Sequence, residues 1–148
     1  MKIAAGADHA GYAIKQAVVR RLRAQGHEVV DMGTGDAETS VDYPDHAHRV
    51  AAAVAAGDAE RGVLVCGTGI GVCMVANRHR GVRAADATTP HLAEMSRRHN
   101  DANVLCLAGR LLSEDEAWAI TAVWMATPFE GGRHMHRVEL IDGESGDA

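Results

Sequence analysis

The chain has 148 residues, 47% of them hydrophobic and 3% aromatic, with a formal net charge of −5. This length suits one domain with its own core, while the acidic balance and the shortage of aromatic side chains argue against binding to nucleic acid or to an anionic membrane surface. The three cysteines lack disulfide or metal-type spacing, residues 1–6 lack a signal-peptide core, and no apolar run reaches membrane-spanning length. We therefore expect a cytoplasmic protein.

Apolar runs alternate with helical periodicity along the chain. Short β-branched and aliphatic runs predict strands, and apolar residues that recur every three or four positions predict amphipathic helices. The expected strands are residues 2–5, 27–32, 62–65, 81–85 and 104–108. The expected helices are residues 13–22, 43–57, 72–77, 88–99 and 114–125.

Local signals support several of these boundaries. Gly26 is a helix stop signal, Pro90 suits a first helical turn, and Ser113 with Glu116 forms the pattern of a capping box. Residues 33–42 predict a polar loop and residues 142–148 a flexible polar tail. The alternation of strands and helices predicts a single α/β domain over residues 1–148, with a parallel sheet and helices on both faces.

The stretch Cys66-Gly67-Thr68-Gly69-Ile70-Gly71 joins a predicted strand to a predicted helix. Glycine lets a ligand approach the backbone closely, and successive N–H groups at a helix start attract an anion. A cysteine beside such a cradle would have its thiolate stabilised by the same field. The pattern therefore suits a catalytic thiol next to an anion hole. It also suits a tight turn without a ligand, and a free cysteine at a strand end is more often a small core residue.

Other candidate residues lie at strand and helix ends. Ligands of parallel sheets bind at the carboxyl ends of the strands, where Asp8, His9, Cys66 and Asp86 are expected. His99 ends the fourth expected helix, where the helix dipole favours its charged form, so it could act as a proton donor or as a cap.

Three arginines are candidate phosphate ligands. Arg110 follows the fifth expected strand, and Arg133 and Arg137 are four residues apart, so a helix would place both on one face. A solvated charged face explains such spacing equally well. His46 with His48, and His134 with His136, suggest a metal, but a two-residue spacing on a helix separates the pair and no Cys or carboxylate set completes a shell. We therefore expect no metal site.

Together these residues resemble the ribose-5-phosphate isomerase type B family, which includes the galactose-6-phosphate isomerase subunits. The stretches that carry the resemblance span nearly the whole chain, and their order and spacing are specific. They are Asp8-His9-Ala10-Gly11, Asp42-Tyr43-Pro44, Cys66 to Gly71, Ser96-Arg97-Arg98-His99-Asn100-Asp101 and Phe129-Glu130-Gly131-Gly132-Arg133-His134 with Arg137.

The resemblance implies a five-stranded parallel sheet in a Rossmann-like αβα sandwich, and interconversion of an aldose phosphate and a ketose phosphate without a cofactor or a metal. It implies a homodimer, or a dimer of such dimers, with sites shared between subunits. Cys66 resembles the base, since the following helix lacks the glutamate that some members use. Thr68 resembles part of the enediolate cradle, and Asp8 and His99 resemble the ring-opening groups. The implied substrate contacts are His9, Tyr43, Gly67, Gly69, Ile70, Gly71, Asn100, Arg110, Arg133 and Arg137.

Ribose 5-phosphate and ribulose 5-phosphate are the expected substrates. Residues 35–41 and 88–91 do not match the family pattern, so a hexose 6-phosphate such as allose or galactose 6-phosphate stays an alternative. A non-catalytic module that binds nucleotides or sugar phosphates is another. A dinucleotide-binding glycine motif, however, should follow the first strand and end in Gly-x-x-Gly, whereas the glycines here follow the third strand.

Overall fold

The computed structural model of the protein describes residues 1–143. Its elements in chain order are β1 (Lys2–Ala7), α1 (Tyr12–Ala24), β2 (Glu28–Asp31), α2 (Tyr43–Ala55), β3 (Arg61–Cys66), α3 (Ile70–Ala76), β4 (Ala84–Asp86), α4 (Pro90–Asn100), β5 (Val104–Ala108), α5 (Glu114–Ala126) and α6 (Arg133–Asp142). The strands pair in the order β2-β1-β3-β5-β4, and all four pairings are parallel. The predicted five-stranded parallel sheet is therefore confirmed.

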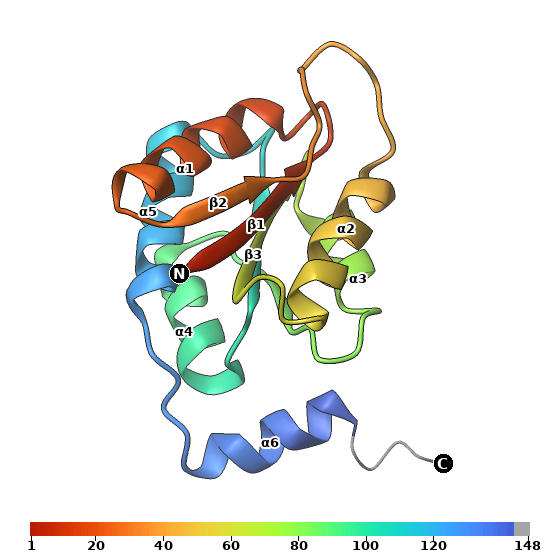
Figure 1. Ribbon diagram of the computed structural model, residues 1–148. Helices are drawn as coiled ribbons and strands as arrows, with labels where there is room; N and C mark the ends of the chain where they lie inside the picture. Colours follow the sequence, from red (N-terminus) through yellow and green to blue (C-terminus); the bar gives the residue numbers. More distant parts are fainter. Residues whose placement is uncertain (144–148) are drawn as a thin grey trace.

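Helices cover the two faces of this sheet (Figure 1), and a cluster of buried apolar side chains lies on each face. Along β3, Val63 and Val65 pack on the α1 and α5 side, whereas Leu64 and Cys66 pack on the α2 and α3 side. This alternation follows from the pleat of a strand, which points successive side chains to opposite faces. The predicted αβα sandwich is confirmed, and the same alternation directs the Cys66 side chain toward α2 and α3.

The sandwich has two functionally different edges. Because parallel strands are joined by crossover helices, each strand ends at one edge and each connecting helix returns to the other. We call them the carboxyl edge, where the strands end, and the amino edge, where they begin. Cys66 lies at the carboxyl edge, whereas α4 ends at the amino edge, where the Arg83 side chain donates to the carbonyl of Asn100 at 3.0 Å.

A buried ion pair fixes the loop that approaches the carboxyl edge. The Lys15 side chain is only 1% exposed, and its Nζ atom lies 2.7 Å from a carboxylate oxygen of Asp31 and 3.0 Å from the carbonyl oxygen of Thr34. Asp31 is the last residue of β2. The pair therefore anchors the start of the polar loop at 33–42 against α1, and the loop rises above the sheet in Figure 1.

Several boundaries differ from the prediction by one or two residues, α6 was not among the expected helices, and two further differences have a clear physical cause. The fourth strand begins at Ala84 and not at residue 81, because the Ala84 N–H donates to the Asn77 side chain at 2.8 Å and the Val82 N–H donates to the His79 carbonyl, which makes residues 79–82 a turn. The tail does not begin at residue 142, because Asp142 belongs to α6 and accepts two hydrogen bonds from Arg83. The rest of the expected tail, residues 144–148, lies outside the described residues. Within residues 1–143 no helix has the length and hydropathy to cross a membrane.

Candidate active site

A pocket of about 480 Å³ opens at the carboxyl edge. Nine of the residues predicted to form the site line it: Asp8, His9, Tyr43, Cys66, Gly67, Thr68, Ile70, Gly71 and Arg110. Ala10 and Met74 also line it, and the sequence analysis had assigned neither of them to the site. Met74 follows Ile70 by four residues on α3, so helical spacing could have suggested it.

Cys66 is the last residue of β3 and is 5% exposed. Its carbonyl oxygen accepts a hydrogen bond from the Gly109 N–H at 2.7 Å, which continues the β3–β5 pairing up to the pocket floor. The thiol is therefore carried by a central strand and not by a loop. This placement suits a group whose position relative to a substrate must be held closely.

The turn after Cys66 requires its glycines. Gly69 has a φ of 78°, and a Cβ atom there would lie 2.6 Å from a carboxylate oxygen of Asp86. A Cβ atom on Gly71 would lie 2.6 Å from Cζ of Tyr43, so the tyrosine ring rests directly on the Gly71 backbone. Any larger residue at position 69 or 71 would displace one of these side chains.

The same turn contains backbone donors without a partner within residues 1–143, and two of the residues that carry them, Gly67 and Thr68, line the pocket. Within residues 1–143, the N–H groups of Gly67, Thr68 and Gly69 meet no acceptor, and the Ile70 N–H donates to the Thr68 hydroxyl at 3.3 Å. Successive free N–H groups in such a turn form a concave site for an anionic oxygen. The predicted anion cradle therefore has the donors it needs.

Asp8 and His9 are held in defined orientations. The Asp8 carboxylate is buried and accepts the Gly11 N–H at 3.0 Å. Nδ1 of His9 accepts the Val41 N–H at 3.2 Å, so the neutral imidazole carries its proton on Nε2. This bond also links His9 to the loop that the family pattern did not match.

Arg110 places a cation at the pocket. Its side chain is exposed, its backbone N–H donates to the Gly67 carbonyl at 3.1 Å, and its Cδ atom lies 3.4 Å from the position of a Cβ atom on Gly67. The guanidinium thus follows the glycine turn toward solvent. Its fork of donors suits an oxyanion such as phosphate.

Cys73, Cys106 and Asp86 lie behind the turn and do not line the pocket. Full burial raises the pKa of the Cys106 thiol well above its usual value, and a hydrogen bond from Cys106 lowers the pKa of Cys73. Burial also raises the pKa of Asp86, one of whose carboxylate oxygens has no hydrogen-bond partner within residues 1–143. Asp86 therefore lies at a strand end, as expected, but supports Gly69 from behind.

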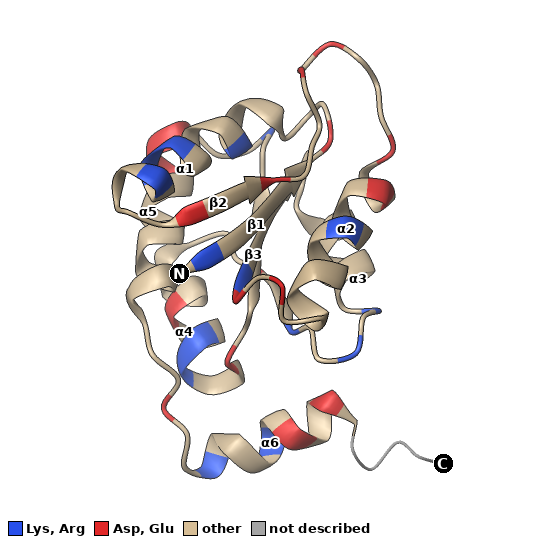
Figure 2. Ribbon diagram, in the orientation of Figure 1, with Lys and Arg blue, Asp and Glu red and all other residues tan. Residues whose placement is uncertain are grey.

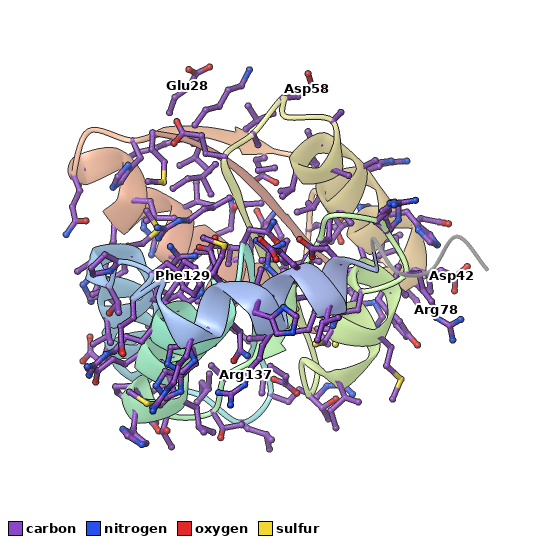
Figure 3. The ribbon with its side chains drawn as sticks, turned by 90° about the horizontal axis from the view of Figure 1, so that it is seen from below. Glu28, Asp42, Asp58, Arg78, Phe129 and Arg137 are labelled. Carbon is purple, nitrogen blue, oxygen red and sulfur yellow. The ribbon has the colours of Figure 1, made fainter. Side chains whose placement is uncertain are left out.

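Four predicted site residues lie elsewhere. His99 and Asn100 end α4, and Arg133 and Arg137 lie on α6, none of them in the pocket that contains Cys66. Figure 2 shows basic residues on α6 and on the adjacent end of α4, and Figure 3 looks from below onto α6 with Arg137 beside it. Both arginines are exposed and make no ion pair within residues 1–143. One copy of the chain thus holds two separate groups of site residues.

Two residues that the sequence analysis did not assign to catalysis surround His99. The imidazole rings of His99 and His134 stack, with centroids 4.3 Å apart and planes inclined by 14°. A carboxylate oxygen of Glu130 lies 3.9 Å from Nε2 of His99, and the other lies 3.8 Å from Nε2 of His134. Glu130 and His134 are four residues apart, a spacing that could have indicated a pair.

This cluster offers three ligand atoms within 4.8 Å of one another, but its geometry does not suit a metal. A metal must lie near the plane of each imidazole that binds it, and two stacked, nearly parallel rings cannot both direct their lone pairs at one ion. His48, from the other histidine pair considered in the sequence, contacts His79. Nδ1 of His48 lies 2.7 Å from Nε2 of His79, a hydrogen bond between two ring nitrogens.

The family model described as Ribose/Galactose Isomerase matches residues 3–141. The chain belongs to the ribose/galactose isomerase family. It is 44% identical over 140 residues to ribose-5-phosphate isomerase B of Escherichia coli K12, covering 95% of this chain and 93% of the relative. The family and the class of enzyme predicted from the sequence, a sugar isomerase, are confirmed.

Solved structures of this family have the same architecture. Clostridium thermocellum ribose-5-phosphate isomerase B is 45% identical and superposes with a TM-score of 0.95, covering 99% of this chain and 98% of that one. Mycoplasma genitalium ribose-5-phosphate isomerase B, solved with bound ribulose-5-phosphate, is 37% identical with a TM-score of 0.94, covering 99% and 97%. The fold of the whole described chain is therefore that of the family.

Proposed function

We propose that this member of the ribose/galactose isomerase family interconverts ribose 5-phosphate and ribulose 5-phosphate through an enediolate, with Cys66 as the base. One observation carries the proposal: the carboxyl-edge pocket combines a strand-held thiol with free backbone donors and the Arg110 guanidinium. The bound ribulose-5-phosphate of the Mycoplasma genitalium relative supports the pentose as the substrate.

In this mechanism the Cys66 thiolate removes the proton from C2 of the open-chain aldose and returns it to C1. The proton of the C2 hydroxyl passes to O1, so the carbonyl moves from C1 to C2. The negative charge that develops on the carbonyl oxygen is stabilised by the free N–H groups of the turn and by the Thr68 side chain. Donors that are already oriented toward a developing oxyanion are usually the largest single contribution to such a reaction.

The cyclic aldose must open before the proton can move. Opening breaks the bond between C1 and O4, and requires a proton for O4 and removal of the proton on the C1 hydroxyl. We assign the first role to His99 and the second to the Asp8 carboxylate. The phosphate is assigned to His9, Arg110, Arg133 and Arg137, and the substrate hydroxyls to Tyr43 and Asn100. Arginine forks on the remote phosphate orient the reacting carbons.

These assignments require a second copy of the chain. His99 lies at the amino edge and Cys66 at the carboxyl edge, and a strand of six residues separates the edges by roughly 20 Å. A side chain cannot cross that distance, so one active site takes Cys66 from one subunit and His99, Asn100, Arg133 and Arg137 from its partner. The assembly is a homodimer, or a dimer of such dimers.

Exposed apolar side chains support such an interface. Ile70 and Met74 on α3, beside the pocket, are 51% and 64% exposed, and Leu140 and Ile141 on α6 are 53% and 57% exposed. Two groups of large exposed apolar residues, one next to each half of the site, are typical of an association surface. In Figure 1, α6 extends from the sandwich below α4, where it can reach a neighbour.

We also propose a cytoplasmic location. Cys66, Cys73 and Cys106 are all free thiols, and a mechanism based on a cysteine thiolate needs a compartment that keeps it reduced.

Isomerisation in deuterated water tests the reaction type. A proton-transfer mechanism places solvent deuterium at C2 of the aldose formed from ribulose 5-phosphate, and activity persists in the presence of a chelator. Absence of label, or activity lost to the chelator and restored by a divalent metal, would contradict the enediolate mechanism. Isomerisation rates measured with allose 6-phosphate and galactose 6-phosphate identify the preferred sugar. A higher rate with either hexose than with ribose 5-phosphate would contradict the pentose assignment.

A further inference from the structure

The surroundings of His99 contain a carboxylate that contacts two imidazoles at once. Glu130 places one oxygen 3.9 Å from Nε2 of His99 and the other 3.8 Å from Nε2 of His134. The His134 ring is stacked on the His99 ring and is only 8% exposed at its side chain. His99 is 40% exposed, so one of its faces is covered by His134 while the residue stays open to solvent.

Glu130 is held in place by α4 itself. Nε of Arg98 donates to a Glu130 carboxylate oxygen at 2.8 Å, and the Glu130 N–H donates to the Arg98 carbonyl at 3.1 Å. Arg98 is held in turn by Glu94 at 3.0 Å. Because Arg98 directly precedes His99, the segment between α5 and α6 is joined to α4 at the residue next to the predicted proton donor.

Glu130 and His134 have different charged neighbours, which shift their pKa values. Arg98 lowers the pKa of Glu130, with smaller contributions from His99 and His134, so the carboxylate stays negative. Burial, the His99 ring and Arg133 lower the pKa of His134, with a further contribution from Arg137. Glu130 acts in the opposite direction on the pKa of His134, but the net effect is that His134 is protonated less readily than an ordinary histidine.

We propose that Glu130 and His134 are positioning residues for ring opening, which orient the His99 imidazole and keep its proton available to O4 of the cyclic aldose. This inference rests on the proposed function, in which His99 opens the ring and Cys66 moves the carbon-bound proton. Glu130 acts through His99 and through Arg98, and His134 acts through the stack. Neither residue takes part in the proton transfer between C1 and C2.

The chemistry of the two substrates separates these steps. Ribose 5-phosphate closes to a furanose through O4, whereas ribulose 5-phosphate cannot form the corresponding furanose because its O5 carries the phosphate. Exchange of the C1 hydrogen of ribulose 5-phosphate with deuterated water needs Cys66 but no ring step. Conversion of ribose 5-phosphate needs both Cys66 and the opening of the ring.

The test measures both rates for Glu130→Gln, which removes the charge while keeping the side chain's size. We expect kcat/KM for ribose 5-phosphate to fall about 10- to 100-fold, which lies within the contribution of a positioned general acid. We expect C1 exchange in ribulose 5-phosphate to stay within about twofold of wild type. Glu114→Gln, which removes the charge from an exposed glutamate paired with Arg20 at 3.9 Å and away from the Arg98 chain, is the matched control and should leave both rates unchanged.

A second pair of variants examines the stack. His134→Ala should lower the ribose 5-phosphate rate in the same way, and His134→Phe, which keeps a flat ring against His99, should recover most of it. A parallel fall of isomerisation and exchange in Glu130→Gln would show a structural role and overturn the inference, as would wild-type isomerisation in Glu130→Gln or in His134→Ala. Loss of the proposed function itself is recognised separately, since Cys66→Ala would then retain exchange.

Discussion

The carboxyl edge and the amino edge of the sandwich hold the two groups of residues to which the proposed mechanism assigns roles. The carboxyl edge has a thiol, free backbone donors and Arg110 around a pocket of about 480 Å³. The amino edge has stacked histidines, a carboxylate and two exposed arginines on α6 that make no ion pair within residues 1–143. The first can stabilise an enediolate, and the second can donate protons and bind phosphate, so neither half is sufficient alone.

The two halves also differ in how they are built. At the carboxyl edge, side chains follow directly from strand ends and short turns, so Cys66 and the glycines are held by the central sheet. At the amino edge, His99 lies in the last turn of a helix, and Arg133 and Arg137 lie on α6, which packs against α4. In the dimer that we propose, the sheet of one subunit holds the reacting centre, and α4 and α6 of the partner supply the second group.

The largest expected effect is at the carboxyl edge. Cys66→Ala should reduce turnover by about 10³-fold or more while sugar-phosphate binding persists, because the base acts after binding. Cys73→Ala is the matched control, since Cys73 does not line the pocket. Steady-state rates and a thermal-shift titration with ribose 5-phosphate measure the two effects. A near-normal rate in Cys66→Ala would remove this thiol from the mechanism.

A thiol reagent offers an independent check on the same residue. Iodoacetamide should inactivate the enzyme through Cys66, and substrate should protect. Cys106 should not react, because it is fully buried and its pKa is raised well above the usual value. Mass mapping of the modified cysteine decides the matter, and inactivation that follows modification of Cys73 alone would contradict the assignment.

The second largest expected effect comes from combining a variant at the carboxyl edge with a variant at the amino edge. His99→Ala should lower turnover of ribose 5-phosphate about 10²-fold. When Cys66→Ala and His99→Ala chains are mixed, unfolded and refolded together, about half of the dimers should be mixed, and each should contain one site without a lesion. About a quarter of wild-type activity should therefore return. If both groups came from one subunit, every site would keep a lesion, and mixed dimers detected by mass spectrometry would be inactive.

A smaller effect compares one arginine from each edge. Removing a charge-assisted hydrogen bond costs roughly 1.5–3 kcal/mol, so Arg137→Ala and Arg110→Ala should each weaken sugar-phosphate binding about 10- to 150-fold. Turnover at saturating substrate should change less. If either variant still prefers phosphorylated over free ribose by the wild-type ratio in a binding titration, the arginine it lacks does not bind the phosphate.

The smallest effect concerns stability at the amino edge. Burial and nearby positive charge lower the pKa of His134 in the folded protein, so below the ordinary histidine pKa of about 6.5 the unfolded chain binds more protons than the folded one. The free energy of unfolding should therefore fall as the pH drops from 7.5 to about 5.5. His134→Phe should reduce this dependence without removing it, because the pKa of His79 is lowered too. Denaturant titrations at the two pH values measure it, and an unchanged dependence would argue against a buried neutral His134.

The sequence by itself determined the features that depend on neighbouring residues. The order of the five strands and of the first five helices, the capping box at Ser113 and Glu116, Pro90 in the first turn of α4 and the glycine turn after Cys66 were predicted, and the structure contains them. The sixth helix, α6, was not predicted. These signals are local, because strand and helix periodicity, caps and turns depend on residues only a few positions apart. Cys66 could be placed at the carboxyl edge for the same reason, since it follows a buried strand directly.

The tertiary structure decided what lies together across the chain. The sequence predicts the edge at which Cys66 lies, but only the fold shows that His99 of the same chain lies about the length of a strand away from it. Only the fold stacks His134 on His99, which precedes it by 35 residues in the sequence. Only the fold shows that the Asn77 side chain shortens β4. Such contacts arise because chain direction, crossover connections and side-chain packing act over distances in sequence that no local pattern records.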